Sequence, residues 1–96
     1  MIKLSGEIIE SVFGGKKELS VSIKANNGIP TRYSMFLGRD TKANRNLANR
    51  FMRAIATGVV LTNPRVVKDI KSKEYVTFDV DVSGRYLNSQ LQKLGF

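Results

Sequence analysis

Apolar and polar residues alternate along most of this chain, which is the pattern of β-strands that bury one face. The cleanest alternation covers residues 18–25, where Leu19, Val21 and Ile23 are separated by serine and lysine. The same period predicts strands that start at residue 2 and at residue 32, a strand over 74–82 and a less regular strand over 65–70. We expect Gly38 to end the strand that starts at residue 32. Gly6, inside the first of these strands, indicates a bend or a bulge.

One segment has helical rather than strand spacing. In residues 41–57, alanine, leucine, phenylalanine and isoleucine side chains recur on one half of a helical wheel. Asp40 or Thr41 can accept hydrogen bonds from the first free N–H groups, and Gly58 can adopt the left-handed conformation that ends a helix. We therefore predict one long helix here and a short second helix over residues 87–94.

The predicted order is three strands, one long helix, two strands and a short C-terminal helix. This is the order of the OB-fold, a five-stranded and partly open barrel. An α+β meander of the same elements is the alternative, because periodicity does not report whether a barrel closes. We expect a mainly β protein with one long helix, arranged as a five-stranded OB-fold barrel.

Composition narrows the function more than it narrows the fold. The chain has 96 residues, a net charge of +8, and neither Cys nor His. This length suits one domain over residues 1–96, with residues 82–96 as a tail. The absence of thiols and imidazoles removes disulfides, the usual zinc sites and most acid–base chemistry. Asp79 and Asp81 are too few for a hard cation, so we expect no enzyme, no metal and no cofactor.

The positive charge favours a polyanionic partner, and an OB-fold would present its basic residues around one face. Such a fold binds oligonucleotides across strands two and three, between the loops that join strands one to two and four to five. Those loops correspond to the basic turns 14–17 and 71–73. The candidate nucleic-acid-binding residues are Lys16, Lys17, Lys24, Arg32, Phe36, Lys71, Lys73 and Tyr75.

Three aromatic residues could stack on bases, and each has an alternative. Phe36 belongs to the core if its strand is read one residue over, and Phe13 either caps the barrel or stacks a base. Tyr75 lies on the polar register next to Lys73. Base stacking on an aromatic ring tolerates any sequence, so these residues predict non-sequence-specific binding.

On the segments LSGEII, ELSVSIKANNG, TRYSMFLG and EYVTFDVDV, the chain resembles the small OB-fold single-stranded-DNA-binding proteins of phages and mobile elements. The resemblance implies a function in replication or recombination of such an element. It departs from the bacterial housekeeping members, which end in a disordered acidic tail, because this chain ends in QLQKLGF.

The long helix carries a second basic surface, composed of Lys42, Arg45, Arg50 and Arg53. Exposed helix faces usually mix both signs of charge, yet no acid follows Asp40 until Asp69. The alternative function is therefore a small interaction or inhibitor protein that uses this face against an acidic protein or a nucleoprotein complex. A solvated or salt-bridged helix face is the competing structural interpretation.

The remaining expectations concern partners and location. Single-stranded DNA is favoured over RNA as the ligand, although a 2′-hydroxyl contact leaves no motif. No apolar run is long enough for a signal peptide or a membrane span, so we expect a cytoplasmic protein without a membrane partner. The C-terminal tail and a sheet edge are the two candidate surfaces for a homodimer.

Overall fold

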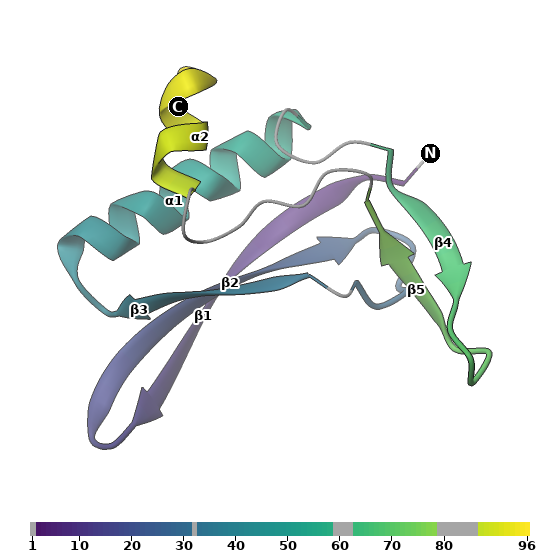
Figure 1. The fold of residues 1–96 in the computed structure, drawn as a ribbon, viewed down its shortest axis with the longest axis horizontal. Coiled ribbons are helices and arrows are strands. Elements are labelled where there is room, and N and C mark those ends of the chain that lie inside the picture. Colours follow the sequence, from purple (N-terminus) through teal and green to yellow (C-terminus); the bar gives the residue numbers. More distant parts are fainter. Residues whose placement is uncertain (1, 32, 59–62, 79–86) are drawn as a thin grey trace.

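The computed structural model describes residues 2–31, 33–58, 63–78 and 87–96, which form five strands and two helices (Figure 1). In chain order these are β1 (Leu4–Phe13), β2 (Lys16–Ala25), β3 (Ser34–Arg39), α1 (Lys42–Thr57), β4 (Arg65–Lys68), β5 (Glu74–Thr77) and α2 (Leu87–Lys93). The helix α1 crosses one face of a three-stranded sheet, and α2 packs on α1 at the side away from the sheet.

The three-stranded sheet, sheet A, has the antiparallel order β1-β2-β3. Leu19, Val21 and Ile23 of β2 are buried, as their alternation predicts, and they face α1. Gly6 was predicted to mark a bend or a bulge, and it forms no bulge, because it pairs regularly with Ile23. Its missing Cβ instead makes room for the helix, since a Cβ there would lie 2.2 Å from the Met52 sulfur.

The bounds of α1 confirm the predicted helix. Thr41 is its N-cap, and the Oγ1 atom of Thr41 accepts a hydrogen bond of 3.1 Å from the Asn44 N–H. Gly58 closes the last turn in the left-handed conformation, with φ of 72°. The apolar half of α1 is buried against sheet A, with Phe51 fully enclosed and its ring stacked on that of Tyr33.

The helix α2 confirms the short second helix. Leu87 and Leu91 are buried and belong to the same core cluster as α1 and sheet A, whereas Leu94 is exposed. None of the helices in the described part of the chain combines the length and the apolar character that crossing a membrane requires.

The predicted five-stranded OB-fold barrel is wrong. The strands β4 and β5 form a separate two-stranded sheet, sheet B. The described residues join the two sheets through one parallel bridge between Thr31 and Val76, where the Val76 N–H donates to the Pro30 carbonyl oxygen at 2.9 Å. The order of strands along a chain is common to barrels and open arrangements, so it did not predict closure.

Two strand boundaries also differ from the prediction. Gly38 was expected to end the third strand, but β3 continues to Arg39 through a register shift opposite Leu19 and Ser20. The strand predicted over residues 74–82 is described only as β5, Glu74–Thr77, and its continuation at 79–82 lies outside the described residues.

Candidate nucleic-acid interface

The candidate interface is the face of sheet A that points away from α1, and we call it the open face. Side chains of paired residues in an antiparallel sheet point to the same side, and neighbours along a strand alternate. Because β2 directs Leu19, Val21 and Ile23 towards α1, the residues between them face away. The open face therefore consists of Ser5, Glu7, Ile9, Ser11 and Phe13 of β1, Lys16, Glu18, Ser20, Ser22 and Lys24 of β2, and Ser34, Phe36 and Arg39 of β3.

Phe36 is a large aromatic side chain in the middle of β3, an edge strand of the open face. It lies opposite Ser20, which in turn lies opposite Ile9, so one row across the three strands is apolar at both ends and small in the middle. The Phe36 side chain is 61% exposed. Of its two alternatives, the exposed orientation is therefore the one observed.

A register shift fixes this orientation. Met35 pairs with Val21 and is buried, while Leu37 also packs against the core. The shift places an extra residue between the pairs Ser20–Phe36 and Leu19–Gly38, so two consecutive residues can face α1. Phe36 is therefore held outward by the burial of the residues on both sides of it.

The charges of the open face largely balance one another. Lys24 forms a salt bridge of 3.1 Å with Glu7, and Glu18 is paired in register with Arg39. Lys16, at the end of the sheet, lies opposite the exposed Phe13. The centre of the face is thus weakly charged and its free positive charge lies at the β1–β2 turn.

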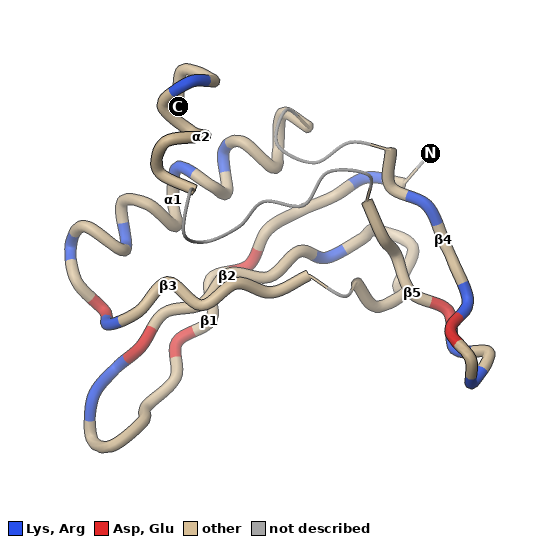
Figure 2. Tube along the Cα trace, viewed as in Figure 1, with Lys and Arg blue, Asp and Glu red and all other residues tan. Residues whose placement is uncertain are grey.

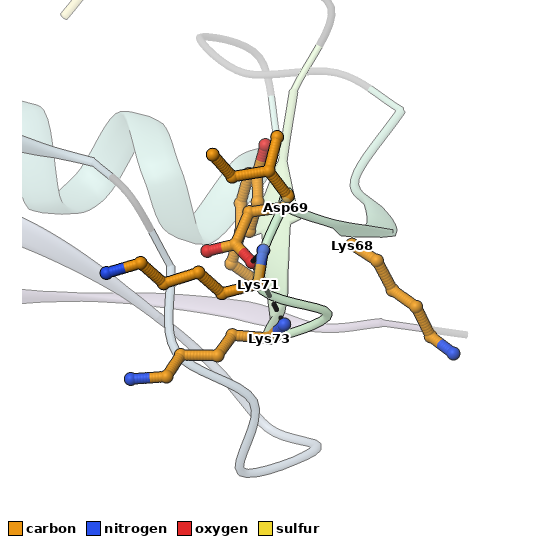
Figure 3. Close-up of a pocket in the computed structure, with 6 residues that line it drawn as sticks. Lys68, Asp69, Lys71 and Lys73 are labelled. Atoms are coloured by element: carbon orange, nitrogen blue, oxygen red, sulfur yellow. Dashed lines mark hydrogen bonds between the residues drawn. The ribbon is translucent and has the colours of Figure 1, made fainter.

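The second basic loop is the β4–β5 turn, where Lys71, Lys73 and Tyr75 surround one open hollow (Figure 3). The Asp69 carboxylate shapes this turn by accepting hydrogen bonds from the main-chain N–H groups of Lys71 (2.8 Å) and Lys73 (3.0 Å). Figure 3 shows the Lys71 and Lys73 side chains extending in one direction and Lys68 in the opposite one. Lys71, Lys73 and Tyr75, which were all predicted as candidate binding residues, therefore lie together at this turn.

The two basic loops do not flank one groove, as the barrel would have required. The β1–β2 turn and the β4–β5 turn lie at opposite ends of the long axis (Figures 1 and 2). Lys16 and Lys17 consequently belong to one end of the molecule, and Lys71, Lys73 and Tyr75 to the other. Arg32 lies outside the described residues.

Two of the four cations predicted on the helix face are used within the molecule. Arg45 bonds both Asp40 oxygens at 2.8 Å and the Glu10 carboxylate at 2.5 Å. The hydrogen bond from Arg45 lowers the pKa of Asp40, and the positive charges of Arg45 and Lys17 lower it further. The hydrogen bonds to Asp40 and Glu10 raise the pKa of Arg45.

Arg50 is the second internally bonded cation. It donates to the main-chain oxygen of Phe96 at 2.8 and 3.0 Å, and to Asn88 at 2.6 Å. Lys42 and Arg53 are exposed. Of the two arginines, Arg45 is therefore salt-bridged, as the competing structural interpretation expects, and Arg50 is hydrogen-bonded within the molecule.

Sequence reasoning left several open-face residues out. Ile9, Arg39 and the exposed orientation of Phe13 follow from the alternation of β1 and β3 once the register is known. Phe13 was expected to cap the barrel or to stack a base, and it is 76% exposed. Extending the alternation of residues 2–8 as far as residue 13 would have placed Phe13 on the polar side.

The described residues contain no group of three or more His, Cys, Asp or Glu side chains that could hold a metal ion. Asp79 and Asp81 lie outside the described residues.

Comparisons of the chain with models of protein families, with curated proteins and with solved structures found no match.

Proposed function

We propose that this protein binds single-stranded nucleic acid, DNA in the first instance, without sequence specificity, on the open face of sheet A. The observation that supports this most directly is the side chain of Phe36, which is 61% exposed on the face of sheet A that points away from α1. An exposed aromatic ring offers a stacking surface to any base.

The surroundings of Phe36 suit stacking better than base reading. Its row partners, Ser20 and Ile9, are small or apolar, so the row offers few hydrogen-bond partners for a base edge. The lysines of the β1–β2 and β4–β5 turns lie at the two ends of the molecule (Figure 2), where they can contact phosphates. This division, with bases on the sheet and phosphates at the loops, is typical of single-strand binding that ignores sequence.

The helix face is less suited to the alternative function, recognition of an acidic protein. Arg45 and Arg50 already bond Glu10, Asp40 and Phe96. Releasing either arginine to a partner would break these bonds.

The biological setting of the proposal rests on the sequence resemblance. It is replication or recombination in the cytoplasm of a cell that carries a phage or mobile element.

The test is fluorescence anisotropy with labelled oligo-dT, a duplex of equal length and a matched RNA, each over a series of salt concentrations. We expect the tightest binding to oligo-dT, and an affinity that falls as salt rises. Phe36→Leu should weaken oligo-dT binding by about 5- to 150-fold, which corresponds to the loss of about 1–3 kcal/mol of stacking on one base. Phe36→Tyr should keep the affinity within about threefold.

The matched control is Val66→Ala, which shortens an exposed apolar side chain on sheet B. It should leave oligo-dT binding unchanged. Equal weak binding to all three nucleic acids, or a Phe36→Leu protein with wild-type affinity, would refute the proposal.

A further inference from the structure

The β1–β2 hairpin extends past the third strand of sheet A. The last pair that β3 makes with β2 is Arg39 with Glu18, whereas β1 and β2 stay paired as far as Phe13 and Lys16. Residues 12–17, which we call the hairpin tip, thus form a two-stranded arm. The two-residue turn has positive φ at Gly14 (58°) and at Gly15 (78°), the pattern that matches the twist of paired strands.

Both faces of the hairpin tip carry an exposed apolar side chain beside a lysine. Phe13 pairs with Lys16 on the open face, and Val12 pairs with Lys17 on the opposite face. Val12 is 69% exposed and Phe13 is 76% exposed. The hairpin tip therefore offers an apolar side chain and a lysine on each of its two faces, and a ligand can contact it from both sides.

The base of the arm is fixed to the rest of the molecule. Arg45 of α1 bonds Glu10 of β1 and also holds Asp40. The Asp40 N–H donates to the main-chain oxygen of Lys17 at 3.0 Å. These bonds connect α1 to both strands of the hairpin just below its tip, so the tip projects in a set direction.

We propose that the hairpin tip recognises the junction between single-stranded and double-stranded DNA, with Phe13 stacked on the last base pair. At such a junction two strands separate, and each carries its own phosphates. The pairs Phe13–Lys16 and Val12–Lys17 then contact one strand each, a base or sugar through the apolar side chain and a phosphate through the lysine. Junction recognition goes beyond single-strand binding on the open face, because it depends on Val12 and Phe13.

The size of the stacking effect decides what the tip can do at a junction. Stacking on one aromatic ring is worth about 5- to 150-fold in affinity. Opening one base-pair step of DNA has an unfavourable equilibrium factor of about 3- to 40-fold. One phenylalanine can therefore compensate for about one step, so the tip binds an existing junction and does not unwind a long duplex.

The experiment compares four labelled DNAs: oligo-dT, a blunt duplex, a duplex with one single-stranded overhang and a fork with two oligo-dT arms. We expect wild-type protein to bind the fork at least about fivefold more tightly than oligo-dT of equal length. The double variant Val12→Ser/Phe13→Ser should lose this preference, because its fork affinity should fall at least about fivefold further than its oligo-dT affinity. Both side chains are exposed, so its melting temperature should stay close to that of the wild type.

Phe36→Leu is the matched control for this experiment, because it should weaken fork and oligo-dT binding by the same factor. Loss of oligo-dT binding in the double variant to the same extent as fork binding would overturn the junction proposal and make the tip an ordinary part of the single-strand surface. A fork preference that survives in the double variant would overturn it as well. A wild-type protein that binds the fork through Val12 and Phe13 but ignores oligo-dT would refute only the proposed function.

Discussion

Met35, Phe36 and Leu37 are neighbours in β3, yet they face different surroundings. Met35 is buried under α1, Leu37 packs against the same core, and Phe36 faces away from it. Turning Phe36 inward would require removing Met35 or Leu37 from the core, which costs about 2–5 kcal/mol for residues of this size. The exposure of Phe36 is therefore a consequence of core packing, and the ring is available to a ligand without rearrangement.

A second residue-scale prediction concerns pH. The hydrogen bond from Arg45 lowers the pKa of Asp40 in the folded protein. A lowered folded-state pKa stabilises the protein above the unfolded-state pKa of about 3.9, and this stabilisation disappears as the pH falls through the folded-state value. Wild-type protein should therefore melt at a higher temperature than Asp40→Asn at pH 6, and the difference should shrink below about pH 4.

The measurement is the melting temperature by circular dichroism from pH 7 to pH 2.5. Glu74→Gln is the control, because it changes an exposed acid of sheet B and should give a difference that varies less with pH. A gap between wild type and Asp40→Asn that stays constant down to pH 2.5 would contradict the account.

At the scale of elements, the sequence predicted what depends on local chemistry. The helix α1 was predictable at both ends, because Thr41 and Gly58 carry the capping chemistry themselves. The alternation of β2 was predictable because all of its inward residues face one core. Gly38 was misread, since a glycine within a register shift has the same local signal as a glycine that ends a strand.

What failed depends on contacts between distant segments. Gly6 was predicted to mark a bend or a bulge, but it forms no bulge, and its missing Cβ makes room for Met52 of α1. No local pattern links these two residues. Phe36 and the lysines of both turns were identifiable as candidates from residue type and strand parity. Their separation into two ends was not, because it follows from sheet B standing apart from sheet A.

The attachment of α2 provides a prediction at this scale. Arg50 of α1 donates to the main-chain oxygen of Phe96 and to Asn88, so one side chain ties both ends of the C-terminal segment to α1. Hydrogen bonds of charged groups contribute about 1.5–3 kcal/mol each when well formed, and less where water reaches them. Arg50→Met should lower the free energy of unfolding by about 1–3 kcal/mol.

Urea denaturation measures this change in the free energy of unfolding. In hydrogen exchange, Arg50→Met should accelerate the exchange of the α2 amides, relative to wild type, more than that of the β2 amides. Arg53→Met removes an exposed arginine one turn away on the same helix and should change the free energy by less than about 0.5 kcal/mol. If both variants are equally stable, Arg50 does not hold α2.

At the scale of the whole molecule, the charges are arranged along its length. The molecule measures 38 × 34 × 20 Å, and its two basic turns lie at the two ends of the long axis (Figure 2). The nearly neutral open face lies between them on sheet A. A long strand bound on this face can contact both ends, whereas a short strand can reach only one end at a time.

This arrangement predicts that salt dependence varies with the length of the oligonucleotide. At about 3.4 Å per stacked nucleotide, the 38 Å axis corresponds to about eleven nucleotides, and to fewer if the strand is stretched. Binding of a 15-nucleotide oligo-dT should lose about 0.7 from its logarithmic salt slope in Lys16→Gln and about 1.4 in Lys71→Gln/Lys73→Gln, because each phosphate contact contributes about 0.7. For a 4-nucleotide oligo-dT, at most one of these variants should change the slope.

Lys42→Gln, on the exposed side of α1, is the control and should leave the salt slope of both oligonucleotides unchanged. A salt slope for the 4-nucleotide oligo-dT that depends on both turns would show that both turns contact one short stretch of strand. That result would contradict a binding surface whose two basic turns lie at opposite ends of the molecule.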